Sequence, residues 1–192
     1  MGAPVLRRFT GGGTVWHDPG NLNVSVVFRP EDAVLADAPS LRRLPELYRL
    51  VLAPLADAVR SLGVAAELTE RDIVAPGGKL SGVAAWIGGR ALLVHATLLV
   101  DADLDALVRV CNGPGAPGDP RWERTRSRRV PVTSVARELG AAPAQASLEA
   151  AVVAAFGATS AGRATLSPAE REAAERLLRD RYSDPAWHAG TE

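Results

Sequence analysis

The chain has 192 residues, of which 47% are hydrophobic and 23% charged, and its 22 basic residues balance its 22 acidic ones. This length is typical of one domain, or of one domain with an appendage. The balanced charge argues against nucleic acid or an anionic membrane as a partner. A single cysteine, Cys111, excludes an internal disulfide framework and a cysteine-based metal cluster. No apolar run has the length of a signal peptide's core or of a membrane span, so we expect a cytoplasmic protein.

Apolar patterning predicts the elements of the first third of the chain. Residues 3–9 and 21–28 are half-alternating and rich in β-branched side chains, which is typical of strands. Residues 41–62 repeat apolar side chains at helical spacing and predict a helix with one buried face. Pro54 lies inside this helix and is expected to kink or break it, because proline lacks a backbone donor. Residues 64–70 predict a further strand.

A hairpin is the clearest element of the middle of the chain. Residues 79–100 contain two strand-like runs joined by Gly88 and Gly89, which predict a two-residue turn with positive φ at both positions. Residues 103–111 predict a short helix that follows this hairpin. Asp103 is its expected N-cap, because its carboxylate can accept a bond from the first helical turn.

The last third of the chain is mainly helical. Residues 112–131 form a Pro/Gly-rich loop followed by an arginine cluster, a composition that fits no packed element. Two helices are predicted at 144–156 and 168–182, the second of them opened by Ser167 and Pro168. Because strands come first and helices lie in the middle and at the end, the pattern predicts an α/β or α+β domain around a largely antiparallel sheet.

The stretch RRFTGGGTVWHDPGN, which begins at Arg7, combines charge with three consecutive glycines. Gly11, Gly12 and Gly13 have two explanations: a tight hairpin turn, or a backbone that a ligand approaches closely, with N–H groups directed at its oxygens. The spacing matches neither the Rossmann nor the P-loop motif. In an extended segment alternate residues share a face, so only one of Arg7 and Arg8 is expected to face such a ligand.

Lys79 and Asp72 are the next candidates. Lys79 is the only lysine of the chain, although arginine is abundant. A lysine offers a compact charge that can follow a carboxylate as it becomes an acyl phosphate, but a single surface lysine left by chance is the alternative. Asp72 could hold a magnesium ion on a nucleotide phosphate, or it could be a solvated turn residue.

The remaining candidates carry weaker signals. His17 and His95 could donate to a phosphate or a carbonyl, although a structural role is more common for a single histidine. Cys111 has no histidine near it in sequence, which favours a buried apolar role over that of a nucleophile. A serine hydrolase is excluded because the GxSxG elbow is missing. An arginine-rich group could contact phosphate or an acidic partner, or could be a solvated loop: Arg121, Trp122, Arg124, Arg126, Arg128 and Arg129.

Three sequence blocks resemble the lipoate–protein ligase A family, within the wider biotin/lipoate ligase and octanoyltransferase fold. They are RRFTGGGTVWHDPGNLNVSVVF, RDIVAPGGKLSGVAAWIGGRALLVHATLLVDADLDALVRVCN and TRSRRVPV, in the family's order. The resemblance implies an α/β (α+β) fold with a mostly antiparallel mixed sheet and flanking helices, a class II biotin/lipoate-ligase-like catalytic domain that is N-terminally truncated. It implies a single domain over 1–192, with a motif-bearing core at 4–160 and a helical part at 161–192.

The resemblance also implies a two-step reaction. Lipoate or octanoate is activated by ATP with Mg²⁺ to an acyl-adenylate, and the acyl group then passes to a lysine of a lipoyl acceptor domain. The implied acceptors are 2-oxoacid dehydrogenases and the glycine cleavage H protein, with a separate accessory subunit as a further partner. The family pattern makes Lys79 catalytic and Asp72 the magnesium residue. It assigns adenylate or substrate binding to Arg8, Gly11, Gly12, Gly13, Thr14, His17, Ser81, Gly82, His95 and Thr97.

Some positions depart from the family pattern. Arg71 stands where the family has asparagine, and Val94 and Ala96 stand where histidine and glycine are common. Family members carry a longer segment before the RR motif, and many carry a C-terminal accessory domain. Three alternatives therefore stay open: an octanoyltransferase that uses a cysteine and no ATP, a biotin ligase, which expects a GRGRxG-type loop, and a non-catalytic or incomplete subunit that needs a partner chain.

Overall fold

The computed structural model of the protein divides into two compact units. One unit comprises residues 10–159, and the other comprises residues 1–9 together with residues 160–192. The organisation of residues 1–192 as a single domain stays a prediction. In the described part of the chain no helix is long and apolar enough to cross a membrane. The structure describes residues 4–32, 43–112, 130–157 and 164–190.

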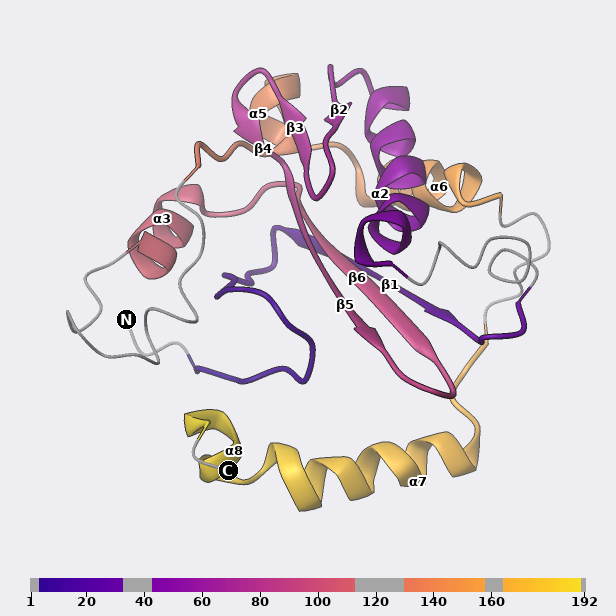
Figure 1. The fold of residues 1–192 in the computed structure, drawn as a ribbon. Coiled ribbons are helices and arrows are strands. Elements are labelled where there is room, and N and C mark those ends of the chain that lie inside the picture. Colours follow the sequence, from indigo (N-terminus) through magenta and orange to yellow (C-terminus); the bar gives the residue numbers. More distant parts are fainter. Residues whose placement is uncertain (1–3, 33–42, 113–129, 158–163, 191–192) are drawn as a thin grey trace. The chain divides into compact units, whose positions relative to one another are not determined.

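The larger unit is built on an antiparallel sheet with the strand order β1-β6-β5 (Figure 1). Its strands are β1 (Asn21–Phe28), β5 (Ser81–Ile87) and β6 (Leu92–Leu99). The predicted strand 21–28 is confirmed at both ends, and the predicted antiparallel sheet is confirmed with it. In the register of this sheet Thr97 of the central strand lies opposite Asn23 on one side and Gly82 on the other.

Helix α2 (Leu44–Ser61) covers one face of this sheet, beside α6 (Gln145–Ala155) (Figure 1). The helix continues through Pro54, so the predicted break there is wrong. Burying one leucine or valine side chain stabilises a core by about 1.5–3 kcal/mol, so this interface holds the unit together. The core residues that α2 and β6 contribute are Leu47, Val51, Leu52, Leu55, Ala56, Val59, Leu92, Val94, Ala96 and Leu98.

A second small antiparallel sheet has the order β2-β3-β4. Its strands are β2 (Glu67–Leu68), β3 (Ile73–Ala75) and β4 (Gly78–Lys79), so the strand predicted at 64–70 is present only in part. The next helices are α3 (Leu104–Asn112) and α5 (Val135–Leu139). The predicted N-cap of α3 is confirmed, because Asp103 Oδ1 accepts from the Ala106 amide at 2.8 Å.

Two of the local predictions are wrong. The strand expected at 3–9 is absent over residues 4–9, which are irregular. The hairpin of β5 and β6 is present, but Ile87 pairs with Leu92, so four residues form its turn instead of two. Gly88 and Gly89 do not have positive φ. A Cβ on Gly88 would overlap the Trp86 ring, so the glycine provides space for this side chain.

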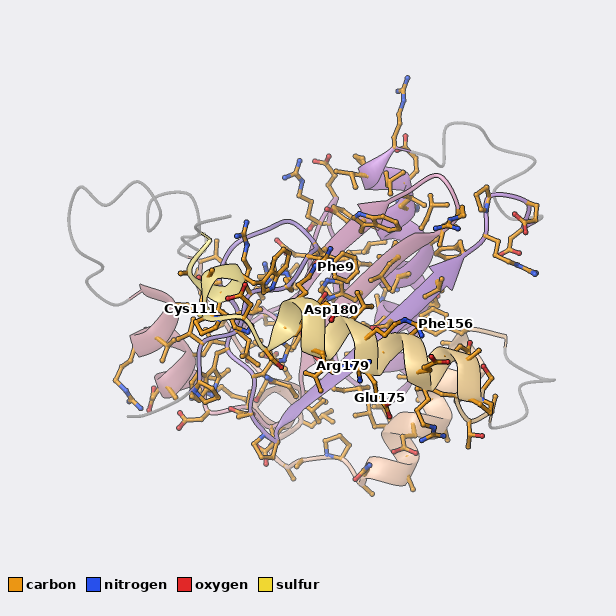
Figure 2. The ribbon with its side chains drawn as sticks, turned by 90° about the horizontal axis from the view of Figure 1, so that it is seen from below. Phe9, Cys111, Phe156, Glu175, Arg179 and Asp180 are labelled. Carbon is orange, nitrogen blue, oxygen red and sulfur yellow. The ribbon has the colours of Figure 1, made fainter. Side chains whose placement is uncertain are left out.

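The smaller unit contains a helical segment of the predicted extent 168–182. It consists of α7 (Pro168–Leu177) and a π-helical turn, η2 (Leu178–Tyr182), and is followed by α8 (Pro185–Ala189). The predicted helix start is confirmed, because Ser167 and Glu170 form a reciprocal capping box. Figure 2 shows the polar side chains of Glu175, Arg179 and Asp180 along this segment.

Candidate active site

The site-bearing surface is the outer face of the β1-β6-β5 sheet, opposite α2. Because Leu92, Val94, Ala96 and Leu98 face the core, the alternation of a strand puts the residues between them on the other side. We define this outer face by the following residues: Asn23, Ser25 and Val27 of β1, Leu93, His95 and Thr97 of β6, and Gly82, Ala84 and Trp86 of β5.

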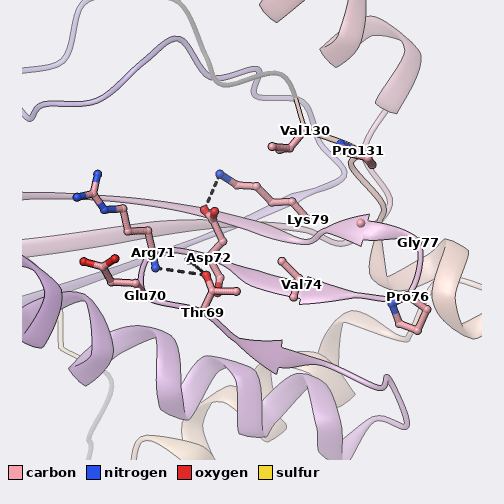
Figure 3. A pocket seen from close by; sticks show the side chains of 11 residues that line it. Thr69, Glu70, Arg71, Asp72, Val74, Pro76, Gly77, Lys79, Val130 and Pro131 are labelled. Carbon is pink, nitrogen blue, oxygen red and sulfur yellow. Dashed lines mark hydrogen bonds and ion pairs between the residues drawn. The ribbon is translucent and has the colours of Figure 1, made fainter.

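Lys79 extends over this face beside Gly82. A Cβ built on Gly82 would lie 4.0 Å from both Nζ and Cε of Lys79, so the glycine leaves room next to the ammonium group. Lys79 Nζ forms an ion pair with Asp72 Oδ1 at 2.6 Å (Figure 3). The two side chains retain 27% and 21% of their full exposure, so a ligand can reach them.

The Lys79–Asp72 pair lines a cavity of about 600 Å³. Thr69 fixes Asp72 in this cavity, because its hydroxyl accepts from the Asp72 amide at 3.0 Å and donates to the Asp72 carbonyl. The Lys79–Asp72 pair offers a half-buried cation and carboxylate, and Arg71 and Glu70 add one exposed charge of each sign, which suits a polyanionic ligand that carries a divalent ion. The cavity is lined by residues 69–72, Val74, Pro76, Gly77, Gly78, Lys79, Val130 and Pro131 (Figure 3).

Polar side chains continue from this pair along the centre of the outer face. Thr97 Oγ1 donates to Asn23 Oδ1 at 2.9 Å, across the pair β1-β6. Thr10 Oγ1 and His95 Nε2 lie 2.7 Å apart, so the segment that leads into the glycine run is tied to the sheet. The structure therefore brings Lys79, Gly82, Thr97 and His95 of the predicted site onto one face.

The glycine run is part of an irregular segment that precedes β1, and it is not a hairpin. Gly12 has a φ of 97°, a conformation that favours glycine, whereas nothing lies within 4 Å of a Cβ on Gly11. Cys111 Sγ donates to the Thr14 carbonyl at 3.8 Å. Figure 2 locates Cys111 at the end of α3.

The residues after the glycine run have a structural role that the sequence did not reveal. Asp18 accepts from the Trp16 indole, from the Gly20 amide and from the Asp103 amide, at 2.8–2.9 Å. A Cβ on Gly20 would overlap the Asp101 carbonyl. This part of the motif thus joins the start of β1 to the start of α3.

Three further predicted site residues differ in their exposure. His17 is exposed. Ser81 is 1% exposed and lies opposite Leu98, on the core side, where its hydroxyl has no hydrogen-bond partner among the described residues. Arg8 belongs to the smaller unit, and its burial lowers its guanidinium pKa from the ordinary value. The arginine cluster at 121–129 lies outside the described residues.

Arg7, the neighbour of Arg8, is held by α8 within the smaller unit. The Arg7 amide donates to His188 Nδ1 at 3.0 Å, and the Trp187 indole donates to the Arg7 carbonyl at 2.9 Å. The Arg7 guanidinium lies 5.0 Å from the centre of the Trp187 ring, a cation–π distance. We call these contacts the Arg7 clasp.

Solved structures of lipoate protein ligases share this fold. A bi-partite lipoate protein ligase, studied with its E2 lipoyl domain from Thermoplasma acidophilum, is 27% identical with a TM-score of 0.74 and covers 97% of this chain and 70% of its own. A putative lipoate protein ligase of that organism with bound lipoic acid is 28% identical (TM-score 0.74; 97% and 71%). A lipoate–protein ligase A bound with ATP is 28% identical (TM-score 0.74; 97% and 72%). The architecture is that of a lipoate-ligase-type catalytic domain.

Proteins of similar sequence identify the family. Lipoate–protein ligase 1 of Staphylococcus aureus is 30% identical over 188 residues, which cover 97% of this chain and 54% of the relative. A putative lipoate–protein ligase A of Aeropyrum pernix is 39% identical over 110 residues, 57% of this chain and 38% of the relative. The chain thus spans about half or less of these relatives. Residues 1–157 match the lipoyl protein ligase A/B catalytic domain, and the chain belongs to that family.

Proposed function

We propose that this chain carries the catalytic centre of a lipoate–protein ligase. The observation that carries the proposal is the Lys79–Asp72 ion pair of 2.6 Å, which lies beside the open position at Gly82 on the outer face. Relatives of the same fold bind lipoic acid and ATP, which supports these two ligands as the substrates. Octanoate is the alternative acyl substrate.

The first step joins two anions. A carboxylate oxygen of lipoate attacks the α-phosphorus of ATP, the bond to the β-phosphate oxygen breaks, and pyrophosphate leaves with its electron pair. Lys79 brings the carboxylate and the phosphate together and stabilises the charge that develops between them. The backbone N–H groups of Gly11, Gly12, Gly13 and Thr14, with Arg8, His17, His95 and Thr97, are proposed to bind the acyl-adenylate. Gly82 is proposed to support the same ligand from β5, whereas Ser81 lies on the core side and is proposed only to hold this strand in place.

Asp72 is proposed to hold the magnesium ion of the nucleotide. Magnesium in phosphoryl-transfer sites is bound by one or two carboxylates together with phosphate oxygens and water, so one carboxylate beside a phosphate site fits it. The ion would reduce the negative charge of the phosphates when Lys79 leaves its ion pair with Asp72 and binds the substrate instead.

The second step transfers the acyl group. The ε-amine of an acceptor lysine attacks the acyl carbon, AMP leaves, and the nitrogen loses a proton as the amide forms. We propose that the acceptor is a lipoyl domain of a 2-oxoacid dehydrogenase or the glycine cleavage H protein. The bi-partite organisation of the Thermoplasma ligase supports a separate accessory subunit as a further partner.

A direct assay tests this proposal. The chain is incubated with lipoate, MgATP and an apo lipoyl domain, with and without the accessory chain, and the acceptor is weighed by mass spectrometry. We expect a lipoyl amide on the acceptor, and pyrophosphate release before transfer. Lys79→Ala should lower the rate of adenylate formation by about 10²-fold or more, because it removes the charge that stabilises the transition state. Arg90→Ala, which removes an exposed cation in the turn of the β5-β6 hairpin, is the matched control. Full activity of Lys79→Ala would contradict the proposal.

An ATP-independent acyltransferase is the second candidate, because Cys111 lies against the Thr14 carbonyl next to the glycine run. Cys111 is only 4% exposed, so an acyl donor has little access to its sulfur. Acyl transfer from an octanoyl carrier without ATP, lost in Cys111→Ser, would establish this alternative in place of the ligase.

A further inference from the structure

The turn that carries Lys79 is held by a segment far from it in sequence. Pro76 and Gly77 form this turn between β3 and β4, and Gly78 is the first residue of β4. The Gly77 amide donates to Glu138 Oε1 at 3.1 Å, and the Thr133 hydroxyl donates to the same oxygen at 2.6 Å. Thr133 is fully buried, so its hydroxyl depends on this carboxylate. One oxygen of Glu138 thereby ties the turn to the chain before α5.

The backbone of Lys79 itself is bonded to the same segment. The Lys79 amide donates to the Pro131 carbonyl at 2.9 Å, and the Thr133 amide donates to the Lys79 carbonyl at 3.0 Å. These two bonds form a parallel bridge between Lys79 and Val132, while Val74 of β3 pairs with Lys79 on the other side. Both backbone groups of Lys79 therefore depend on where residues 131–133 lie.

Close packing requires glycine both at position 77 in the turn and at position 78 in β4. A Cβ on Gly77 would overlap Glu138 Oε1 and lie 2.8 Å from Thr133 Oγ1. A Cβ on Gly78 would lie 2.6 Å from the Pro131 carbonyl oxygen, and Gly78 has a φ of 132°. The turn is thus fitted to the surface formed by Pro131, Thr133 and Glu138, which we call the Lys79 frame.

Glu138 is itself fixed, because α5 is capped at both ends. Ser134 Oγ accepts from the Arg137 amide at 3.2 Å, and Gly140 ends the helix in the left-handed conformation. The Ala136 amide donates to the Val100 carbonyl at 2.8 Å, which joins this helix to the chain just after β6. The carboxylate is therefore presented from a rigid element connected to the main sheet.

We propose that Glu138 is a positioning residue for Lys79. Its carboxylate sets the turn at Gly77, the turn sets the backbone of Lys79, and the backbone sets the ammonium group against Asp72. The expected effect on catalysis rests on the proposed function, whereas the expected effect on the position of Lys79 does not. A displacement of about 1 Å at a reacting group can cost about 10²-fold in rate, so a missing acceptor 59 residues away in sequence is expected to affect the chemistry.

Three variants separate the loss of the hydrogen-bond acceptor at position 138, the loss of its charge, and the loss of a glutamate elsewhere in the chain. Glu138→Leu keeps the size of the side chain but removes the acceptor, and it leaves the Thr133 hydroxyl buried without a partner. Glu138→Gln removes the charge but retains an amide oxygen that can accept both bonds. Glu149→Leu, on the exposed side of α6, is the control for a glutamate lost elsewhere.

The single lysine of the chain provides a readout that does not depend on activity. Reductive methylation of the full-length chain with ¹³C-formaldehyde labels Lys79 and the α-amino terminus only, so the Lys79 methyl signal reports its environment in NMR spectra. We expect this signal to shift in Glu138→Leu and to stay at the wild-type position in Glu138→Gln and Glu149→Leu.

Steady-state assays of the unlabelled proteins complete the experiment. In Glu138→Leu we expect kcat for adenylate formation to fall about 10- to 100-fold with a smaller change in KM, and in Glu138→Gln about threefold at most. An unshifted Lys79 signal in Glu138→Leu, or a kcat within twofold of wild type, overturns the inference. A loss that follows only the unfolded fraction, measured by thermal denaturation, overturns it as well. A wild-type protein without adenylate formation would refute the proposed function, while a shifted signal would still support the positioning of Lys79.

Discussion

The two basic groups proposed to bind the acyl-adenylate are held in different ways. Lys79 is fixed through its backbone, by the Lys79 frame inside the unit 10–159. The arginine pair is fixed through Arg7, whose amide and carbonyl are bonded to the side chains of His188 and Trp187, about 180 positions away in the chain. The position of Lys79 depends on a close steric fit of backbone against its neighbours, whereas the position of Arg7 depends on hydrogen bonds to two side chains, which can be substituted.

This difference has a consequence for tolerance to mutation. A close fit of backbone against backbone leaves no room for an added atom, so a single methyl group can displace Lys79. Contacts through half-exposed side chains are individually worth about 0.5–1.5 kcal/mol, and water can replace them. We therefore expect substitutions in the Lys79 frame to have larger effects than substitutions in the Arg7 clasp.

The largest effect is expected from Gly78→Ala, which should disrupt the packing of Gly78 against the Lys79 frame. The added Cβ would lie 2.6 Å from the Pro131 carbonyl oxygen, at a φ that L-residues rarely adopt. Such backbone strain costs about 1–3 kcal/mol before the clash is counted. We expect a lower melting temperature and a loss of about 10²-fold in the rate of adenylate formation, measured as pyrophosphate release.

Gly89→Ala is the control for this prediction. Gly89 has ordinary backbone geometry and nothing within 4 Å of a Cβ, so alanine should be accommodated with wild-type stability and activity. Equal effects of the two substitutions would mean that the fit of the turn against Pro131 is not what positions Lys79.

The sequence predicted the elements whose signals are local. Strand β1 was correct to the residue, because alternation over 21–28 reflects one buried face. Lys79 was singled out as the only lysine and by its motif, and its proximity to Asp72 agrees with that choice. The argument that Arg7 and Arg8 face different ways assumed a strand that is absent over residues 4–9, so it stays a prediction, and the Arg7 clasp describes Arg7 alone.

The missed features depend on contacts between distant parts of the chain. The pairing of Lys79 with Val132 has no local signature, although two adjacent glycines before the candidate lysine were a usable hint of close approach. Gly88 was misinterpreted because a glycine that gives space to the Trp86 ring looks the same in sequence as one that adopts positive φ. The segment 3–9 has strand-like composition, but no described strand pairs with residues 4–9.

A smaller effect is expected from substitution of Trp187, which makes two of the contacts of the Arg7 clasp. Trp187→Leu removes the indole donor and the ring beneath the guanidinium, and we expect KM for ATP or lipoate to rise about three- to tenfold with little change in kcat. Trp187→Phe keeps the ring but not the donor, so its effect should be intermediate. Steady-state kinetics measure the change, and hydrogen exchange at the Arg7 amide reports whether the clasp has opened. A fall in kcat as large as that of Gly78→Ala would remove the distinction between the two regions.

The smallest expected effect comes from the start of α7, which shares a unit with the Arg7 clasp but does not contact Arg7 through any described bond. Ser167→Ala removes the N-cap and should lower helix stability by about 0.5–2 kcal/mol. Hydrogen bonds from the Ser167 side chain and then from its amide lower the pKa of Glu170. Because the folded pKa lies below the unfolded one, this carboxylate stabilises the helix above the unfolded pKa, and the stabilisation is lost as the pH falls through the folded pKa.

Far-UV circular dichroism from neutral to acidic pH measures this effect on α7. Wild-type helicity should fall as Glu170 is protonated, and Ser167→Ala should have lower helicity at neutral pH with a weaker pH dependence. Its ligase kinetics at neutral pH should stay within about twofold of wild type, because the cap acts on the helix and not on Arg7. If Ser167→Ala instead raised KM as much as Trp187→Leu, the integrity of the whole C-terminal segment, and not the pair of bonds to Arg7, would be what supports the arginine side of the site.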